Sequence, residues 1–188
     1  MKKTIQFLSL LTIGATLFTS CKKDPVVEDN DNEVITTMQL RFVPLGGGTT
    51  VTYAYDDADG PGGAAPTKQT ITLAPNKSYN VTLTLLNKTA NPITDITTDI
   101  NGAEAIAHRF YFASTANSNI TISSLNNDPN GVELGTSSTW STGAIATGKT
   151  TVTLRHYGGN PPGKAIADLV TSTKSSTDIE VQFDTVIQ

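Results

Sequence analysis

The sequence predicts an all-β protein, an immunoglobulin-like antiparallel β-sandwich of about eight strands with at most one short helix. Three observations support this fold class. Apolar and polar residues alternate along much of residues 34–188, which is typical of strands with one buried face. Turn-forming residues separate these runs at spacings of roughly ten to fifteen residues. The connections also lack the helices that parallel crossovers require.

The first four strands follow from this two-residue alternation. Pro44 and the glycines at 46–48 end the first run, and the acidic, glycine-rich stretch 56–63 ends the second. The third and fourth runs flank a five-residue turn, so we expect them to form a β-hairpin. The four expected strands are residues 34–42, 50–55, 70–73 and 79–85.

The second half of the chain alternates less regularly. Isoleucines and Asp95 suggest one short helix near residues 95–106. Residues 108–112 then restart a strand, and we expect residues 120–122 to pair with it across the turn at 116–118. The last two strands are expected at 152–156 and 179–183, and Leu169 and Val170 lie either on an edge segment or on a long loop.

The N-terminus has the layout of a secretion signal. Met1-Lys2-Lys3 is positively charged, an apolar run extends from Phe7 to Phe18, and the only cysteine, Cys21, follows small residues. The apolar run is shorter than the about 20 residues that a membrane-spanning helix needs. The segment resembles a bacterial lipoprotein signal, which implies that residues 1–20 are removed and that Cys21 is lipidated. An ordinary cleaved signal followed by an incidental cysteine is the alternative.

Residues 21–33 are expected to form an acidic tether between the lipid and a domain of residues 34–188. Without residues 1–20 the chain keeps 11 of its 13 basic residues and all 17 acidic ones, a net charge of about −6. This charge argues against nucleic acid or an anionic membrane surface as a partner, because both bind basic patches. With a single cysteine, no disulfide forms within the chain.

Several longer runs carry a resemblance to a known group. The runs FVPLGGG, YAYDDADGPGG and TITLAPNKSYNVTLTLLN and the terminal VIQ resemble an uncharacterised group of Bacteroidetes envelope lipoproteins, some labelled "type 1 periplasmic binding fold" proteins. The resemblance implies a β-sandwich fold and a place at the bacterial outer membrane, with a lean toward the cell surface. It implies no activity.

The sequence contains little that would support catalysis. It has no Gly-x-Ser-x-Gly motif, its only cysteine is assigned to the lipid, and only two histidines could act as bases. We therefore expect a protein that is not an enzyme.

The two histidines form the first candidate site. His108 is in phase with the inward-facing residues of its strand, and so is His156. If the two strands are antiparallel, both rings lie at the same end of the sandwich, and Glu104, four residues before His108, could supply an oxygen ligand. Two imidazoles and a carboxylate suit zinc or copper. The alternative is that each histidine caps the core with one hydrogen bond.

Two acidic turns are weaker candidates for calcium. Asn126, Asp128 and Asn130 match the first half of a calcium-binding loop, but the position of the closing acid holds Ser137. The second turn contains Asp56, Asp57 and Asp59. Ordinary tight turns favour the same residue types.

Aromatic residues offer a third candidate, a carbohydrate-binding surface. Trp140 lies among serines and threonines, and Tyr157 precedes two glycines, so either ring could stack on a sugar. Packing in the core is the alternative.

The sequence thus predicts a lipid-anchored envelope protein that is a ligand-binding or surface-presentation module. Its expected partners are the membrane, through the lipid, and an outer-membrane transporter or a surface ligand. A metal-binding protein and a carbohydrate-binding module are the alternative functions.

Overall fold

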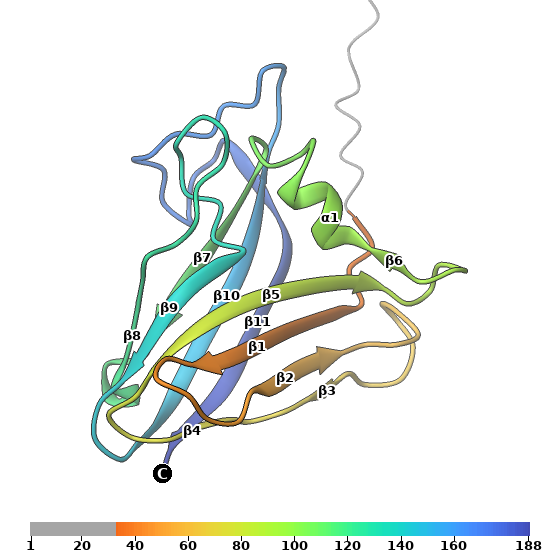
Figure 1. Cartoon of the computed structure of the whole chain (residues 1–188). Coiled ribbons are helices and arrows are strands. Elements are labelled where there is room, and N and C mark those ends of the chain that lie inside the picture. Colours follow the sequence, from red (N-terminus) through yellow and green to blue (C-terminus); the bar gives the residue numbers. More distant parts are fainter. Residues whose placement is uncertain (1–32) are drawn as a thin grey trace, which may run out of the picture.

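The computed structural model describes residues 33–188, which form two β-sheets packed face to face (Figure 1). The larger sheet has the strand order β3-β2-β1-β5-β9-β8, and β6 pairs with β5 at one end. Its strands are β1 (Thr37–Pro44), β2 (Val51–Asp56), β3 (Thr67–Lys68), β5 (Ser78–Asn87), β6 (Thr94–Asp95), β8 (Ile120–Ser123) and β9 (Ser137–Thr142). The all-β prediction is confirmed.

The smaller sheet has the order β4-β11-β10-β7. Its strands are β4 (Ile71–Leu73), β7 (His108–Ser114), β10 (Ala146–Tyr157) and β11 (Ser175–Ile187). The pair β11–β4 is parallel, and the other strand pairs of both sheets are antiparallel. The smaller sheet is therefore antiparallel except at its edge strand β4, which pairs in parallel with β11.

Both expected hairpins are wrong. The strands β4 and β5 belong to different sheets, and so do β7 and β8. The alternating pattern identifies which face of a strand is buried, and it is the same for strands of either sheet of a sandwich. It therefore located these strands without showing which neighbours they pair with.

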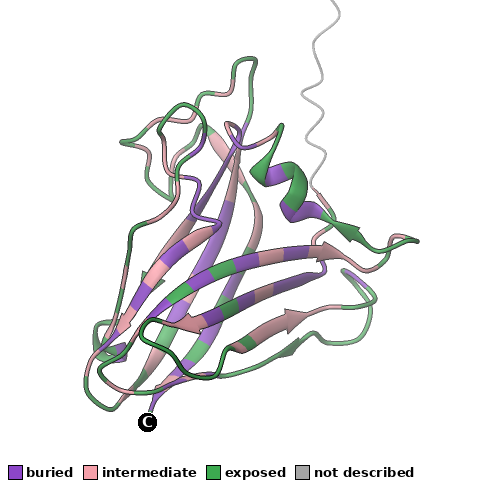
Figure 2. Cartoon of the chain, in the orientation of Figure 1, coloured by how far each residue is buried: buried purple, intermediate pink, exposed green. Residues whose placement is uncertain are grey.

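The core lies between the two sheets and is built from the alternating residues of both (Figure 2). Fully buried side chains of the larger sheet include Leu40 and Phe42, and those of the smaller sheet include Leu154 and Phe183. This two-sided burial supplies the main stabilisation of a chain without disulfides.

The expected short helix is present as α1 (Ile96–Asn101). The Asp95 side chain accepts a hydrogen bond from the backbone N–H of Thr97 at its N-terminus, and the helix buries Ile100 against the core. Gly102 is the residue at which the helix ends. Among residues 33–188, no helix has the length and apolar character needed to span a membrane.

Residues 158–174 connect β10 to β11 without helix or strand. Leu169 and Val170 lie on this long loop, which decides between the two placements that the sequence left open.

Candidate metal centre

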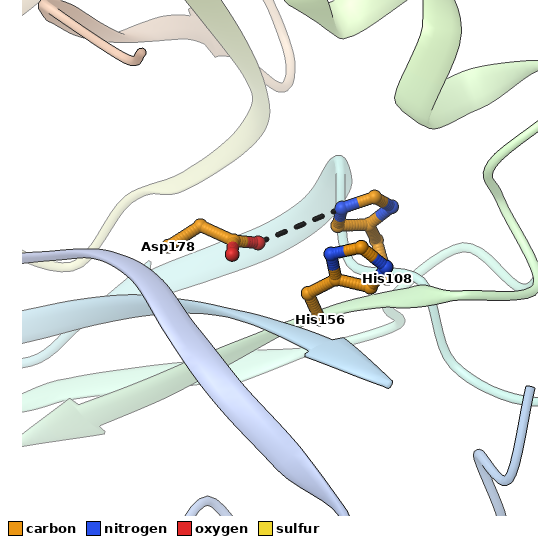
Figure 3. Close-up of side chains that lie close together, drawn as sticks. All are labelled: His108, His156 and Asp178. Atoms are coloured by element: carbon orange, nitrogen blue, oxygen red, sulfur yellow. Dashed lines mark ion pairs between the residues drawn. The ribbon is translucent and has the colours of Figure 1, made fainter. Parts of the chain in front are cut away.

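The two histidines meet at one end of the smaller sheet. His108 is the first residue of β7, and His156 is the last but one of β10. The antiparallel register pairs them directly, and their ring centroids lie 4.6 Å apart (Figure 3). The prediction that both rings share one end of the sandwich is confirmed.

A third side chain, that of Asp178, lies beside the histidines because of a β-bulge in β11. Thr177 and Ile179 pair with consecutive residues of β10, so Asp178 between them has no partner across the ladder. A bulge re-aims a side chain, and the Asp178 side chain is fully buried although Ile179 beside it also packs on the core. One of its carboxylate oxygens, Oδ2, lies 3.5 Å from Nε2 of His108.

The protonation of His108 follows from its surroundings. Nδ1 lies 3.1 Å from the backbone carbonyl oxygen of Glu104, which can only accept, so Nδ1 carries the hydrogen and Nε2 presents a lone pair. Burial lowers the pKa of His108 to about 4, so the ring is neutral at physiological pH. Histidines that bind metal ions commonly have this arrangement, with the distal N–H held by a carbonyl or carboxylate.

The facing polar atoms of this cluster have no hydrogen-bond partners. Nε2 of His108, Nδ1 of His156 and both carboxylate oxygens of Asp178 are buried and make no hydrogen bond within the described chain. Buried polar atoms nearly always have partners, and an exception calls for a specific explanation. Burial also raises the pKa of Asp178 to about 6, against the opposing effects of His156 and Arg155. Such a group of atoms requires either a proton or a cation.

The spacing suits a small divalent cation. One ligand atom each from His108, His156 and Asp178 lies within 4.8 Å of the other two. Two ligands on a tetrahedral zinc ion, with bonds of about 2.1 Å, are about 3.4 Å apart. The 3.5 Å between Nε2 of His108 and Oδ2 of Asp178 is close to this separation. Two imidazoles and one carboxylate fit zinc or copper better than the hard cations, which prefer oxygen ligands.

Two further carboxylates lie on the other side of the His108 ring. Oε2 of Glu104 is 3.8 Å from Nδ1, and its side chain is 45% exposed. Donor atoms of Glu33 and Glu104 lie within 4.8 Å of each other and of a His108 nitrogen. Burial, followed by a hydrogen bond with Glu104, raises the pKa of Glu33 to about 8. Glu104 is therefore beside His108 as expected, but the group of possible donors that contains both histidines has Asp178 as its third member.

A buried ion pair between Lys164 and Asp128 contacts the backbone of His108. Nζ of Lys164 lies 2.7 Å from Oδ2 of Asp128, and both side chains are only 1% exposed. The same ammonium group donates to the backbone carbonyl oxygens of Ala105 and His108, at 2.8 and 2.7 Å. Lys164 therefore fixes the backbone on which the histidine is mounted.

Asp128 is not a calcium ligand in this structure, because its carboxylate is already bound. Besides the Lys164 contact, Oδ1 accepts the backbone N–H groups of Asn130 and Val132. Burial raises the pKa of Asp128, but Lys164 and these N–H groups hold it below its ordinary value. The side chain of Asn126 bonds to Thr136 and Ser137. The turn expected to hold calcium is a structural turn closed by an ion pair.

Two of the three carboxylates in the second acidic turn make contacts within the protein. Asp56 forms an ion pair with Lys88 at 2.7 Å, and Asp59 accepts the backbone N–H of Ala64. Within residues 33–188, the groups of three donors that could share an ion do not include Asp56, Asp57 or Asp59. One buried carboxylate oxygen of Asp57, Oδ1, makes no hydrogen bond, so the calcium interpretation of this turn stays a prediction.

The carbohydrate-stacking interpretation is contradicted by burial. Trp140 and Tyr157 are both 0% exposed. The Trp140 ring packs edge-on to Phe42 and donates its N–H to Ser138, and the hydroxyl groups of Tyr157 and Tyr111 lie 2.5 Å apart. Neither ring offers a face to a sugar, because both complete the interior of the sandwich.

Comparisons with known proteins add no identification. No protein family matches the chain, and no curated protein or solved structure is significantly similar to it. The signal segment, Cys21 and the tether up to residue 32 lie outside the described residues. The candidate site therefore rests on its own geometry.

Proposed function

We propose that this chain is a lipid-anchored envelope protein whose β-sandwich binds one divalent transition-metal ion, with zinc as the simplest fit. His108, His156 and Asp178 would be its protein ligands, and a water molecule or substrate atom would complete the coordination. The metal ion would be the ligand of the binding module that the sequence predicts. The proposal includes no catalytic step.

One observation carries the metal assignment. Side chains from three neighbouring strands bring buried polar atoms without hydrogen-bond partners close together, with one possible ligand atom of each within 4.8 Å of the others. Burying a carboxylate against two lone pairs is costly without a compensating cation. A bound ion would supply positive charge to all three, and the Nδ1 contact of His108 with the Glu104 carbonyl already holds the correct tautomer.

The anchor and the location rest on the sequence. The lone Cys21 follows an apolar signal-like segment at the position where lipidation would use it. A location at the outer membrane follows from the resemblance to envelope lipoproteins. A transporter or surface partner for this module is a proposal on the same basis.

Calorimetric titration of the purified mature chain with zinc and copper tests the metal site. We expect one ion per chain with micromolar or tighter affinity. The substitution Asp178→Asn should weaken binding by about 100-fold or more, because even loss of an outer-shell partner typically costs roughly 10–100-fold. His108→Ala should have a comparable effect.

Asp184 provides a matched control for this titration. It lies on the same strand, β11, but its side chain is 53% exposed and pairs with Lys149. Asp184→Asn should leave the affinity unchanged. Absence of binding heat with zinc, copper and calcium would refute the metal site, and so would equal affinities of the Asp178 and Asp184 variants.

A further inference from the structure

The loop of residues 158–174 has an unusual distribution of polar and apolar side chains. Loops of this length without regular structure are uncommon inside a compact domain and are usually functional. Its aliphatic side chains point outward: Ile166 is 75% exposed, Leu169 69% and Val170 38%.

Buried charged groups hold this loop in place. Arg109, 7% exposed, donates to the backbone carbonyl oxygens of Ala165, Ile166 and Asp168 at 3.2–3.3 Å. Lys164 is buried in its ion pair with Asp128. The loop is therefore attached through its backbone and its polar residues, which leaves its aliphatic side chains facing solvent.

The exposed aliphatic residues lie toward the end of the sandwich where the described chain begins. A carboxylate oxygen of Glu33 lies within 4.8 Å of Glu104 and His108, and Lys164 donates to the backbone carbonyl oxygens of Ala105 and His108. The start of the domain and the loop thus flank the same short segment, residues 104–108. Figure 1 shows both toward the end opposite the C-terminus, and the neighbouring Val34 is also 47% exposed.

We propose that Ile166, Leu169 and Val170 dock into the bilayer that carries the lipid anchor. This inference rests on the anchoring part of the proposed function and not on the metal. Aliphatic side chains inserted at the interface add membrane affinity to that of an acyl anchor. The end of the sandwich that carries the metal centre would then face the membrane.

The length of the tether favours this orientation. Cys21 and Glu33 are 12 residues apart, a reach of at most about 40 Å when fully extended. Strand β10, with 12 residues, is itself about 40 Å long. Turning the far end of the domain to the bilayer would require the tether to run fully extended along the sandwich, whereas the loop end needs no such extension.

A second protein is a poorer occupant of this surface. Three aliphatic side chains expose much less than the roughly 800 Å² per partner that a stable protein interface buries. Shallow insertion among lipid headgroups and acyl chains needs no such area. The observations therefore favour the bilayer.

The test uses two isoleucines with the same exposure at opposite ends of the molecule. Ile166 lies on the loop, and Ile145, also 75% exposed, precedes the first residue of β10. Each is replaced by cysteine in the full-length acylated protein, whose own Cys21 is blocked by the lipid. A fluorophore that responds to polarity is attached, and the protein is reconstituted in uncharged phosphatidylethanolamine–phosphatidylcholine vesicles.

We expect the fluorophore at Ile166→Cys to shift to the blue and to be quenched by nitroxide-labelled lipid several-fold more strongly than the one at Ile145→Cys. Leu169→Asn, added to the Ile166→Cys chain, should reduce that quenching. Equal quenching at both positions, or none at either in protein that floats with the vesicles, would overturn the docking proposal. Quenching that requires added envelope proteins would assign the loop to a protein partner instead and also overturn it.

The anchor itself is tested separately in the same preparation. The intact mass reports acylation, and flotation reports attachment to the vesicles. A chain that is not acylated and does not float contradicts the anchor and with it the docking proposal, whereas a floating chain with a water-exposed Ile166→Cys contradicts the docking alone.

Discussion

Two buried ionisable clusters involve His108, one through its backbone carbonyl and one through its ring, and they differ in how their atoms are partnered. In the first, the Lys164 ammonium is within 2.8 Å of Asp128 and of two backbone carbonyl oxygens. In the second, facing atoms of His108, His156 and Asp178 are buried and make no hydrogen bond. The first cluster holds the fold together without any added group. The second lacks such internal partners, and for this reason we propose it as the metal-binding site.

The largest effect on stability is expected when the buried ion pair between Lys164 and Asp128 is broken. Lys164→Met leaves the Asp128 carboxylate buried without its cation, and removing one partner of a buried ion pair costs about 3–5 kcal/mol. Urea denaturation in the presence of a chelator should show this loss in the free energy of unfolding. Lys174→Met is the matched control, because Lys174 forms an ion pair of similar length with Asp168 but is 53% exposed. Exposed ion pairs contribute about 0–1 kcal/mol. Equal losses of unfolding free energy in the two variants would contradict the claim that the Lys164 ion pair holds the fold together.

A second prediction concerns the pH dependence of the ion-free protein. Burial lowers the pKa of His108 to about 4 and raises that of Asp178 to about 6, so the two groups change stability in opposite directions as pH rises, and only below pH 6.5. Glu33, with its pKa raised from 4.5 to about 8, keeps a proton in the folded state that the unfolded state has released. Stability should therefore fall as pH rises from 6.5 to 8.

Glu33→Gln removes this titration, so its unfolding free energy should stay level over the same interval. Denaturant unfolding at several pH values, with chelator present, measures both proteins. A fall of equal steepness in Glu33→Gln would show that another group is responsible for the pH dependence.

The smallest effect is expected from Glu104→Gln, which tests whether the ion lies on the Nε2 side or the Nδ1 side of the His108 ring. Glu104→Gln keeps the backbone carbonyl that accepts the Nδ1–H, so zinc affinity should fall by less than about tenfold, below the usual cost of losing an outer-shell partner. Calorimetry of this variant beside Asp178→Asn makes the comparison. If Glu104→Gln were as damaging as Asp178→Asn, the ion would have to lie on the Nδ1 side, between Glu33 and Glu104.

The sequence predicted the parts of this molecule that depend on local periodicity. Alternation located most strands and placed His108 and His156 on inward faces. It did not predict sheet membership, since β4 and β5 have the same pattern but lie in different sheets. It also missed β9, whose serines and threonines carry little apolar alternation apart from Trp140.

The candidate site was predicted in part, for the same reason. The two histidines obey the alternation, and Glu104 is near them along the chain. Asp178 breaks the rule, because strict alternation from Ile179 places it on the solvent face and only the bulge turns it inward. Glu33 was assigned to the tether, because its contacts with Glu104 and His108 come from a segment about 70 residues away in the sequence. No sequence motif marks such a contact.

The single unpaired position in β11 also has a consequence for how this centre could arise or disappear. Residues of β11 on either side of position 178 follow opposite odd–even numbering for their inward faces. Deleting that one residue would restore an uninterrupted ladder with β10 and leave a regular sheet with two histidines and no carboxylate. The sandwich can therefore gain or lose the proposed third ligand through a one-codon insertion or deletion, without rebuilding its interior.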